Sequence, residues 1–93
     1  MLLILACTSV CEDLAGLERD DCLARRIEAM SEPAEVRVEA EKIEDRIVLH
    51  AAVMTWVEAH RAADRQGLLE LCGLLEHEHH TICKRRVEAA HLQ

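Results

Sequence analysis

The chain has 93 residues, of which 51% are hydrophobic and 31% are charged, and its formal net charge is −7. This length suffices for one small domain and excludes a Rossmann fold, a TIM barrel and any two-domain enzyme. Phe and Tyr are absent, Trp56 is the only aromatic residue, and three Gly and one Pro are present. These counts argue against a many-stranded β fold, and the acidic balance argues against nucleic-acid binding. The composition therefore predicts an all-α protein.

The chain begins with an apolar segment. Residues 1–6 are wholly apolar and Cys7 follows them, but six residues cannot span a bilayer, which takes about 20. The motif Ile4-Leu5-Ala6-Cys7 resembles the lipobox of bacterial lipoproteins, with an aliphatic residue at its first position and a small residue directly before the cysteine. Leu5 is bulkier than the usual residue at its position, and no Lys or Arg precedes the apolar run.

The lipobox resemblance implies a processing step and a location. Residues 1–6 would be the remnant of a signal peptide, residues 7–93 would form a single mature domain, and Cys7 would carry the lipid. The protein would then be anchored to a membrane of the cell envelope and face the periplasm or the exterior, and Thr8 after the cysteine favours the outer membrane. The alternative is that residues 1–6 simply extend the first helix.

Helix boundary signals divide the rest of the chain into three predicted helices, over residues 9–30, 33–62 and 65–90. Thr8 and Ser9 can cap the first helix, Ser31 can cap a second helix that has Pro33 in its first turn, and Asp64 can cap the third. We find no internal repeat. Short turns between three helices predict an up-down-up three-helix bundle in which the first and third helices run parallel.

The predicted second helix carries two apolar sides. One is a heptad-like stripe that consists of Val36, Ala40, Ile43, Ile47, Met54 and Val57. The other, formed by Leu49, Val53 and Trp56, lies in the later part of the helix. We expect this second side to contact a further helix, a partner protein or a second copy in a homodimer.

Four cysteines remain after Cys7, and they form two pairs with equal spacing. Cys11 and Cys22 are eleven residues apart, as are Cys72 and Cys83. In a continuous helix this spacing returns each pair to one face, about 16 Å apart along the axis. Two such helices could be joined by two disulfides, which would fit an oxidising compartment. The alternative is that all four are buried free thiols in a cytosolic bundle.

The connectivity of the bundle favours one of two cross-helix pairings. In a parallel register, Cys11 would pair with Cys72 and Cys22 with Cys83. An antiparallel register would join Cys11 to Cys83 and Cys22 to Cys72. The up-down-up topology favours the parallel register, which also places Glu18 opposite His79. No CxxC motif is present, so we expect these cystines to stabilise the fold rather than to perform redox chemistry.

The segment Glu76-His77-Glu78-His79-His80 is the only local cluster with ligand chemistry. His79 lies on the cysteine face of its helix, and His50 lies on the stripe of the second helix. With Glu18 they form a candidate zinc or copper site. The alternative is that His79 forms an ion pair with Glu18 while His77 and His80 are solvated.

We find no sequence pattern for catalysis. The chain lacks a Gly-rich phosphate loop, and Ser9 and Ser31 occupy positions typical of helix caps. We therefore expect a non-enzymatic protein without a cofactor and without a nucleic-acid partner. The first functional hypothesis is a small lipid-anchored, disulfide-stapled helical protein with a structural or interaction role in the envelope. The alternative is an envelope metal-binding or metal-sensing bundle that uses His79, His50 and Glu18.

Overall fold

The structure is a computed structural model that describes residues 11–92. Those residues form one short 3-10 helix and five α-helices, without a strand, which confirms the all-α prediction. The elements are η1 (Cys11–Asp13), α2 (Gly16–Glu28), α3 (Pro33–Ala40), α4 (Arg46–Ala59), α5 (Arg65–Cys72) and α6 (His77–His91).

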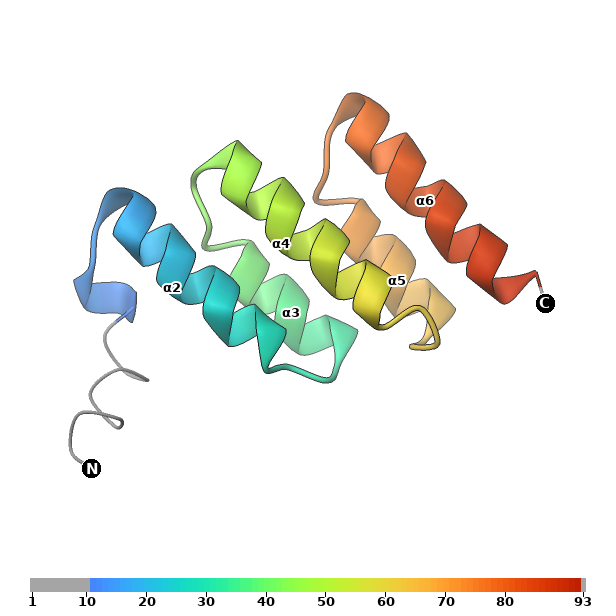
Figure 1. Ribbon diagram of the computed structural model, residues 1–93, viewed down its shortest axis with the longest axis horizontal. Coiled ribbons are helices and arrows are strands. Elements are labelled where there is room, and N and C mark those ends of the chain that lie inside the picture. Colours follow the sequence, from blue (N-terminus) through green and yellow to red (C-terminus); the bar gives the residue numbers. More distant parts are fainter. Residues whose placement is uncertain (1–10, 93) are drawn as a thin grey trace.

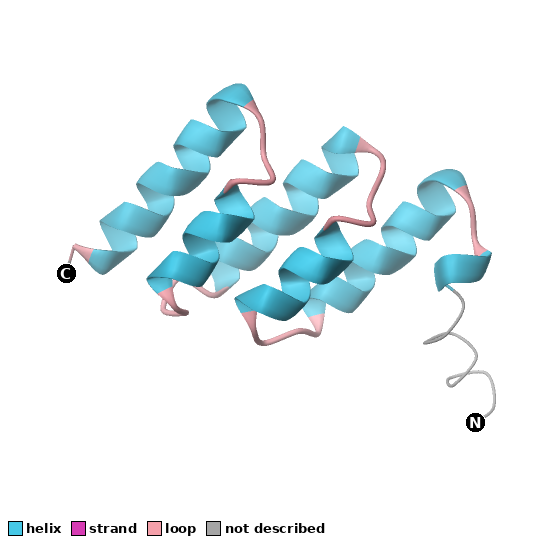
Figure 2. Cartoon of the chain, turned by 180° about the vertical axis from the view of Figure 1, so that it is seen from behind, coloured by secondary structure: helices cyan, strands magenta, loops and turns pink. Residues whose placement is uncertain are grey.

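The helices form two layers. The longer helices α2, α4 and α6 lie side by side and run in the same direction, and the shorter helices α3 and α5 lie behind them in the opposite direction (Figure 1). Figure 2 shows the same arrangement from the side of α3 and α5. Helix α4 contacts both α2 and α6, whereas α2 and α6 do not contact each other. The fold is therefore a row of three hairpins, η1 with α2, α3 with α4 and α5 with α6, rather than a three-helix bundle.

The hairpins recur at a regular interval, although no internal repeat was found in the sequence. Helices α2, α4 and α6 begin at Gly16, Arg46 and His77. Two layers of the core follow the same interval, because each takes one fully or almost fully buried side chain from each long helix. These two sets are Leu23, Val53 and Cys83, and Ile27, Val57 and Val87. Residues at corresponding positions bury the same face of each long helix, so the structure contains a helical repeat of about 30 residues.

The predicted helix over residues 33–62 is interrupted at residues 41–45. The break contains neither Gly nor Pro, and its signal is Asp45, whose side chain accepts a hydrogen bond from the Val48 N–H at 3.0 Å and so caps α4. The interruption also ends the predicted apolar stripe. Val36, Ala40 and Ile43 are buried, whereas Ile47 on the new helix is 80% exposed.

The predicted helix over residues 65–90 is also interrupted, at residues 73–76. Gly73 is the C-terminal cap of α5, and α6 begins four residues later at His77. A similar break separates η1 from α2, where Gly16 has a φ of 60° that favours glycine. The predicted caps Thr8 and Ser9 lie outside the described residues. Ser31 is not a cap, since Glu32 precedes Pro33 as the N-terminal flanking residue of α3.

These interruptions overturn the predicted disulfide pairing. The structure joins Cys11 to Cys22 and Cys72 to Cys83, with a Cα–Cα distance of 5.5 Å in each pair. Neither of the two pairings between the first and third predicted helices, Cys11–Cys72 with Cys22–Cys83 or Cys11–Cys83 with Cys22–Cys72, is therefore formed. The physical reason is that the chain turns back between the two cysteines of each pair. Each disulfide thus staples one hairpin internally.

Candidate functional site

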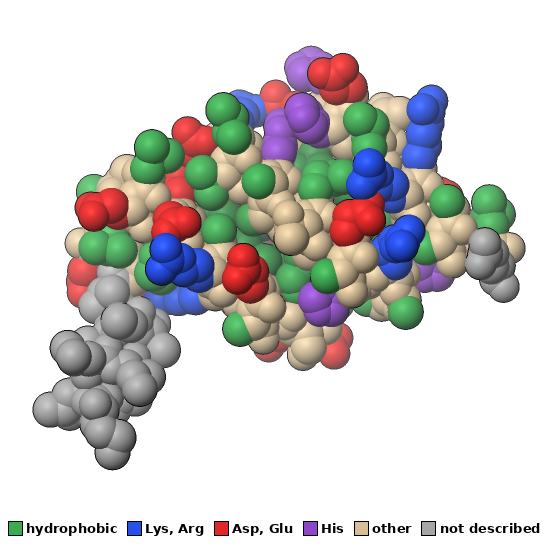
Figure 3. All heavy atoms as spheres, viewed as in Figure 1, with side chains coloured by type: hydrophobic (Ala, Val, Ile, Leu, Met, Phe, Trp, Pro, Cys, Tyr) green, Lys and Arg blue, Asp and Glu red, His purple; other side chains and the backbone are tan. Residues whose placement is uncertain are grey.

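Within residues 11–92, a groove with a volume of about 390 Å³ lies between α2 and α4. Its α2 wall consists of Asp21, Ala24, Ile27 and Glu28. Its α4 side consists of Ile47, Val48, Ala51, Ala52, Thr55, Trp56, Ala59 and His60, the last of which ends the helix. We call this site the α2–α4 groove. Because α3 and α5 cover the other side of these helices, the groove opens on the face shown in Figure 3, where hydrophobic side chains lie beside acidic ones.

Small side chains form most of the α4 side of the groove and project little from the helix. Ala51, Thr55 and Ala59 follow one another at intervals of four residues, so they lie on one face of α4, and all three are exposed. Ile47 continues this line toward the start of the helix and is 80% exposed. The line is therefore a continuous strip of small and apolar side chains on which another backbone could approach closely.

One end of the groove has a rigid aromatic floor. Trp56 is 2% exposed, and its Nε1–H donates a hydrogen bond to the backbone carbonyl of Met30 at 3.0 Å. The His60 ring stacks on the indole, with the ring centroids 3.9 Å apart and the planes at 10°. The Nδ1 atom of His60 lies 3.0 Å from the Trp56 carbonyl oxygen. These contacts fix both rings before any ligand arrives.

Two carboxylates stand on the α2 wall. Asp21 forms an ion pair with Arg25 at 2.9 Å, and both side chains are well exposed. Glu28 is exposed and forms no ion pair with any residue from 11 to 92. The groove therefore combines an apolar floor with negative charge along one edge.

Of the predicted metal ligands His50, His79 and Glu18, the structure brings only the two histidines together. The His50 and His79 rings meet between α4 and α6, with centroids 4.4 Å apart and the planes tilted by 35°. His50 Nε2 is buried and makes no hydrogen bond within the described part of the chain. Burial, the neighbouring His79 and the charge of Arg46 lower the pKa of His50 below its usual value.

Glu18 does not join the two histidines. It lies on α2, and α4 separates this helix from α6, so the predicted Glu18–His79 contact is wrong. Residues 11–92 contain no group of three His, Cys, Asp or Glu side chains that could hold a metal ion. The candidate zinc or copper site is thus reduced to a pair of imidazoles, and the parallel register that suggested the third ligand is absent.

The second apolar side of the predicted middle helix is mostly part of the core. Val53 and Trp56 are 0% and 2% exposed, and Leu49 is partly buried against the core cluster that contains them. They therefore offer little surface to a partner or a second copy, although Trp56 borders the α2–α4 groove. The exposed face of α4 is instead the strip from Ile47 to Ala59, whose repeated small residues Ala51, Thr55 and Ala59 are the sequence signal that could have revealed it.

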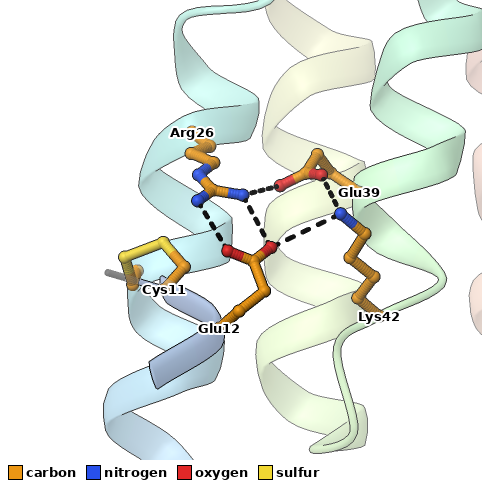
Figure 4. A network of polar contacts seen from close by, with 6 residues as sticks. Cys11, Glu12, Arg26, Glu39 and Lys42 are labelled. Carbon is orange, nitrogen blue, oxygen red and sulfur yellow. Dashed lines mark hydrogen bonds and ion pairs between the residues drawn. A yellow bond between two sulfur atoms is a disulfide. The ribbon is translucent and has the colours of Figure 1, made fainter. Parts of the chain in front are cut away.

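A network of charged side chains on the other side of α2 links neighbouring elements of the fold (Figure 4). The Arg26 guanidinium donates to both carboxylate oxygens of Glu12 and to Glu39, each at 3.0 Å, while Lys42 donates to Glu39 at 2.7 Å. The Arg26 hydrogen bond lowers the pKa of Glu12 to about 2. Glu39 is 7% exposed, and although burial raises its pKa, hydrogen bonds from Lys42 and Arg26 lower it overall. The network ties η1, α2 and α3 together.

Comparison with known proteins adds no family name. Neither a protein family, nor a curated protein, nor a solved structure matches the chain. The proposed lipidation site Cys7 and the preceding residues 1–6 lie outside the described residues. None of the helices within residues 11–92 has the length and apolar character needed to cross a membrane. The class that the structure defines is a disulfide-stapled array of helical hairpins with an apolar groove.

Proposed function

We propose that this protein is a small, non-enzymatic interaction protein of the cell envelope that binds a helical segment of a partner protein in the α2–α4 groove. The groove is the observation that carries the proposal. It exposes apolar side chains along α4 on a framework that two disulfides stabilise, and Ile47 at its edge remains 80% exposed. An amphipathic helix laid into such a groove would remove these side chains from water.

The cellular part of the proposal rests on two features of the sequence and structure. The lipobox-like motif that ends at Cys7 supports a lipid anchor, and the two cystines support an oxidising compartment. Attachment through Cys7 would hold the helical array at a membrane surface facing the periplasm or the exterior. Replacing Cys7 with Ser should move the protein from the membrane fraction to the soluble fraction, whereas unchanged partition would remove the anchor from the proposal.

Site-specific photo-crosslinking in the producing cells tests the groove. A crosslinker at Thr55, which is exposed in the groove, should give an adduct of defined mass, and one at Val38, 59% exposed on α3, should not. The substitution Ala51→Gln narrows the groove and should abolish the adduct, while the matched substitution Ala34→Gln on the exposed face of α3 should preserve it. An adduct that persists in Ala51→Gln would contradict the proposal.

The metal-binding alternative has less support. The His50–His79 contact provides two imidazoles, but the third proposed ligand, Glu18, stands on a helix that does not contact α6. A titration with zinc or copper and a chelator control would test it. Binding that disappears in both His50→Gln and His79→Gln, but not in Glu18→Gln, would assign any metal to the histidine pair.

A further inference from the structure

The shape and charge of the α2–α4 groove restrict the chemistry of its occupant. This argument rests on the proposed function, because it takes the groove as the binding surface and asks which partner fits it. The apolar strip along α4 extends from Ile47 to Ala59, which corresponds to about 18 Å of helix. A partner helix of about three turns would cover this length.

The small residues of the groove allow a helix to pack directly against both walls. Ala24 lies on α2, while Ala51, Ala52 and Ala59 lie on α4. Helices pack with their axes about 8–10 Å apart, and alanines at the contact permit the shorter distances. The bound helix can therefore carry large aliphatic side chains, because the small side chains of the groove leave room for them. An apolar stripe with helical spacing on the partner would fill it.

Charge complementarity selects among such helices. Asp21 and Glu28 lie seven residues apart on the α2 wall, a separation of two turns or about 10 Å. No Lys or Arg lines the groove. Glu28 has no ion-pair partner within residues 11–92, and the exposed Asp21–Arg25 pair can exchange one guanidinium for another at little cost. Two cations spaced by two turns would match these carboxylates.

We infer that the α2–α4 groove binds a basic amphipathic helix of a partner protein, with aliphatic side chains against Ala51 and Thr55 and Lys or Arg side chains on Asp21 and Glu28. The acidic wall and the formal net charge of −7 disfavour an anionic membrane surface as the occupant. They equally disfavour an acidic peptide.

Two synthetic peptides test this inference. Both are Ala-rich helices with one leucine stripe. The first has two arginines seven residues apart beside the stripe, and the second has two glutamates at those positions. Trp56 lines the groove and is the only aromatic residue, so its fluorescence reports binding, with calorimetry as a second readout. The basic peptide should bind and the acidic peptide should not, and added salt should weaken binding.

Matched variants connect the affinity to the two carboxylates. Each of Asp21→Asn and Glu28→Gln should weaken binding of the basic peptide about two- to fivefold, as expected for exposed ion pairs. The control Glu35→Gln, exposed on α3, should not change it. Ala51→Gln should abolish binding of the basic peptide, and Ala34→Gln should not. Far-UV circular dichroism of each variant confirms that it is folded.

Several outcomes would overturn the inference. Equal affinity for both peptides, or an affinity unchanged in Asp21→Asn and Glu28→Gln, would show that charge does not select the partner. If the protein instead bound phosphatidylcholine vesicles with Thr55 and Ala51 in contact with the lipid, the groove would be a lipid-binding site. A dimer in light scattering that Glu28→Gln dissociates would assign it to a second copy. The in-cell crosslink separates failure of this inference from failure of the proposed function. If the peptides do not bind as expected but Ala51→Gln still abolishes the adduct at Thr55, the proposed function stands and only the inferred chemistry of the partner is wrong.

Discussion

Asp20 on α2 accepts a hydrogen bond from the backbone N–H of Asp45 at 2.8 Å, and its second oxygen accepts one from the N–H of Glu44 at 3.1 Å. Asp20 is only 2% exposed. The two N–H groups belong to the loop that separates α3 from α4, so a side chain of the first hairpin holds the turn of the second. Asp45 in turn caps α4 through Val48, and α4 forms one side of the groove.

We expect Asp20→Ala to destabilise the protein by about 3 kcal/mol, because two partly buried N–H groups lose a charged acceptor. Urea unfolding followed by circular dichroism would measure the change. The substitution Asp21→Ala next to it serves as the control, since Asp21 is exposed and should cost less than about 1 kcal/mol. Equal losses in both variants would show that Asp20 does not hold the loop.

The disulfide pairing can be mapped without reduction. Trypsin cleaves after Arg19, so the peptide that ends there should remain joined to the peptide Asp20–Arg25 through Cys11 and Cys22. No Lys or Arg separates Cys72 from Cys83, and a protease that cleaves after Glu76 and Glu78 is needed to reveal the second bond. A peptide that joins Cys11 to either Cys72 or Cys83 would contradict the hairpin pairing.

Removing either disulfide should lower the free energy of unfolding by about 3 kcal/mol, because each closes a loop of about a dozen residues. The test uses the double substitutions Cys11→Ala with Cys22→Ala, and Cys72→Ala with Cys83→Ala, in urea titrations. The wild-type protein with and without a reducing agent provides the comparison. A variant as stable as the oxidised wild type would rule out a stabilising role for that bond.

The His50–His79 contact predicts loss of stability in mild acid. Burial and the adjacent His79 and Arg46 lower the pKa of His50 in the folded state, so the unfolded chain binds the proton more readily. Stability should therefore decrease as the pH falls below the unfolded value of about 6.5 and continue to decrease until the folded group is protonated. Arg46 pairs with Glu76, which keeps a cation beside the two rings.

Thermal melts between pH 8 and pH 5 would show this dependence. His50→Gln should reduce the slope of the melting temperature against pH, and His77→Gln should leave it unchanged, because the His77 side chain is 90% exposed. A slope that survives His50→Gln would place the titrating group elsewhere.

A second loss of stability should follow in stronger acid. Arg26 lowers the pKa of Glu12 from 4.5 to about 2. The contribution of Glu12 is therefore complete above the unfolded pKa and is lost as the pH falls through the folded value. Chemical unfolding between pH 5 and pH 2 should show a smaller acid loss for Glu12→Gln than for the wild type. An identical acid loss would show that the Arg26–Glu12 pair does not contribute.

Helical composition and local capping were readable from the sequence, whereas the path of the chain was not. Asp64 caps α5 by accepting from Gly67 at 2.8 Å, and Pro33 begins α3, both as predicted. The break at residues 41–45 has no Gly or Pro, and it depends on Asp20, which is 25 residues away from Asp45. The Asp45 cap is a local signal, but the contact with Asp20 is tertiary and leaves no local pattern.

The cysteine spacing predicted the wrong disulfide pairing because neither segment between paired cysteines is one continuous helix. Eleven residues place two cysteines on one face of a continuous helix, but Gly16 and Gly73 each lie between the members of a pair and mark the turns that bring them together. Of the predicted apolar stripe, Val36, Ala40, Ile43 and Val57 are buried, because packing follows helical periodicity within each helix. The groove was missed because alanine is compatible with both a buried and an exposed helix face.

The distribution of the two disulfides has a dynamic consequence. Both outer hairpins are closed by a covalent bond, whereas the middle hairpin, α3 with α4, contains no cysteine. The middle hairpin packs against both neighbours but has no covalent bond of its own, so we expect opening fluctuations to concentrate there. Amide hydrogen exchange should therefore be fastest among the helical amides of α3 and α4. The groove would then consist of one wall fixed by a cystine and one that can adjust its tilt to the helix it receives.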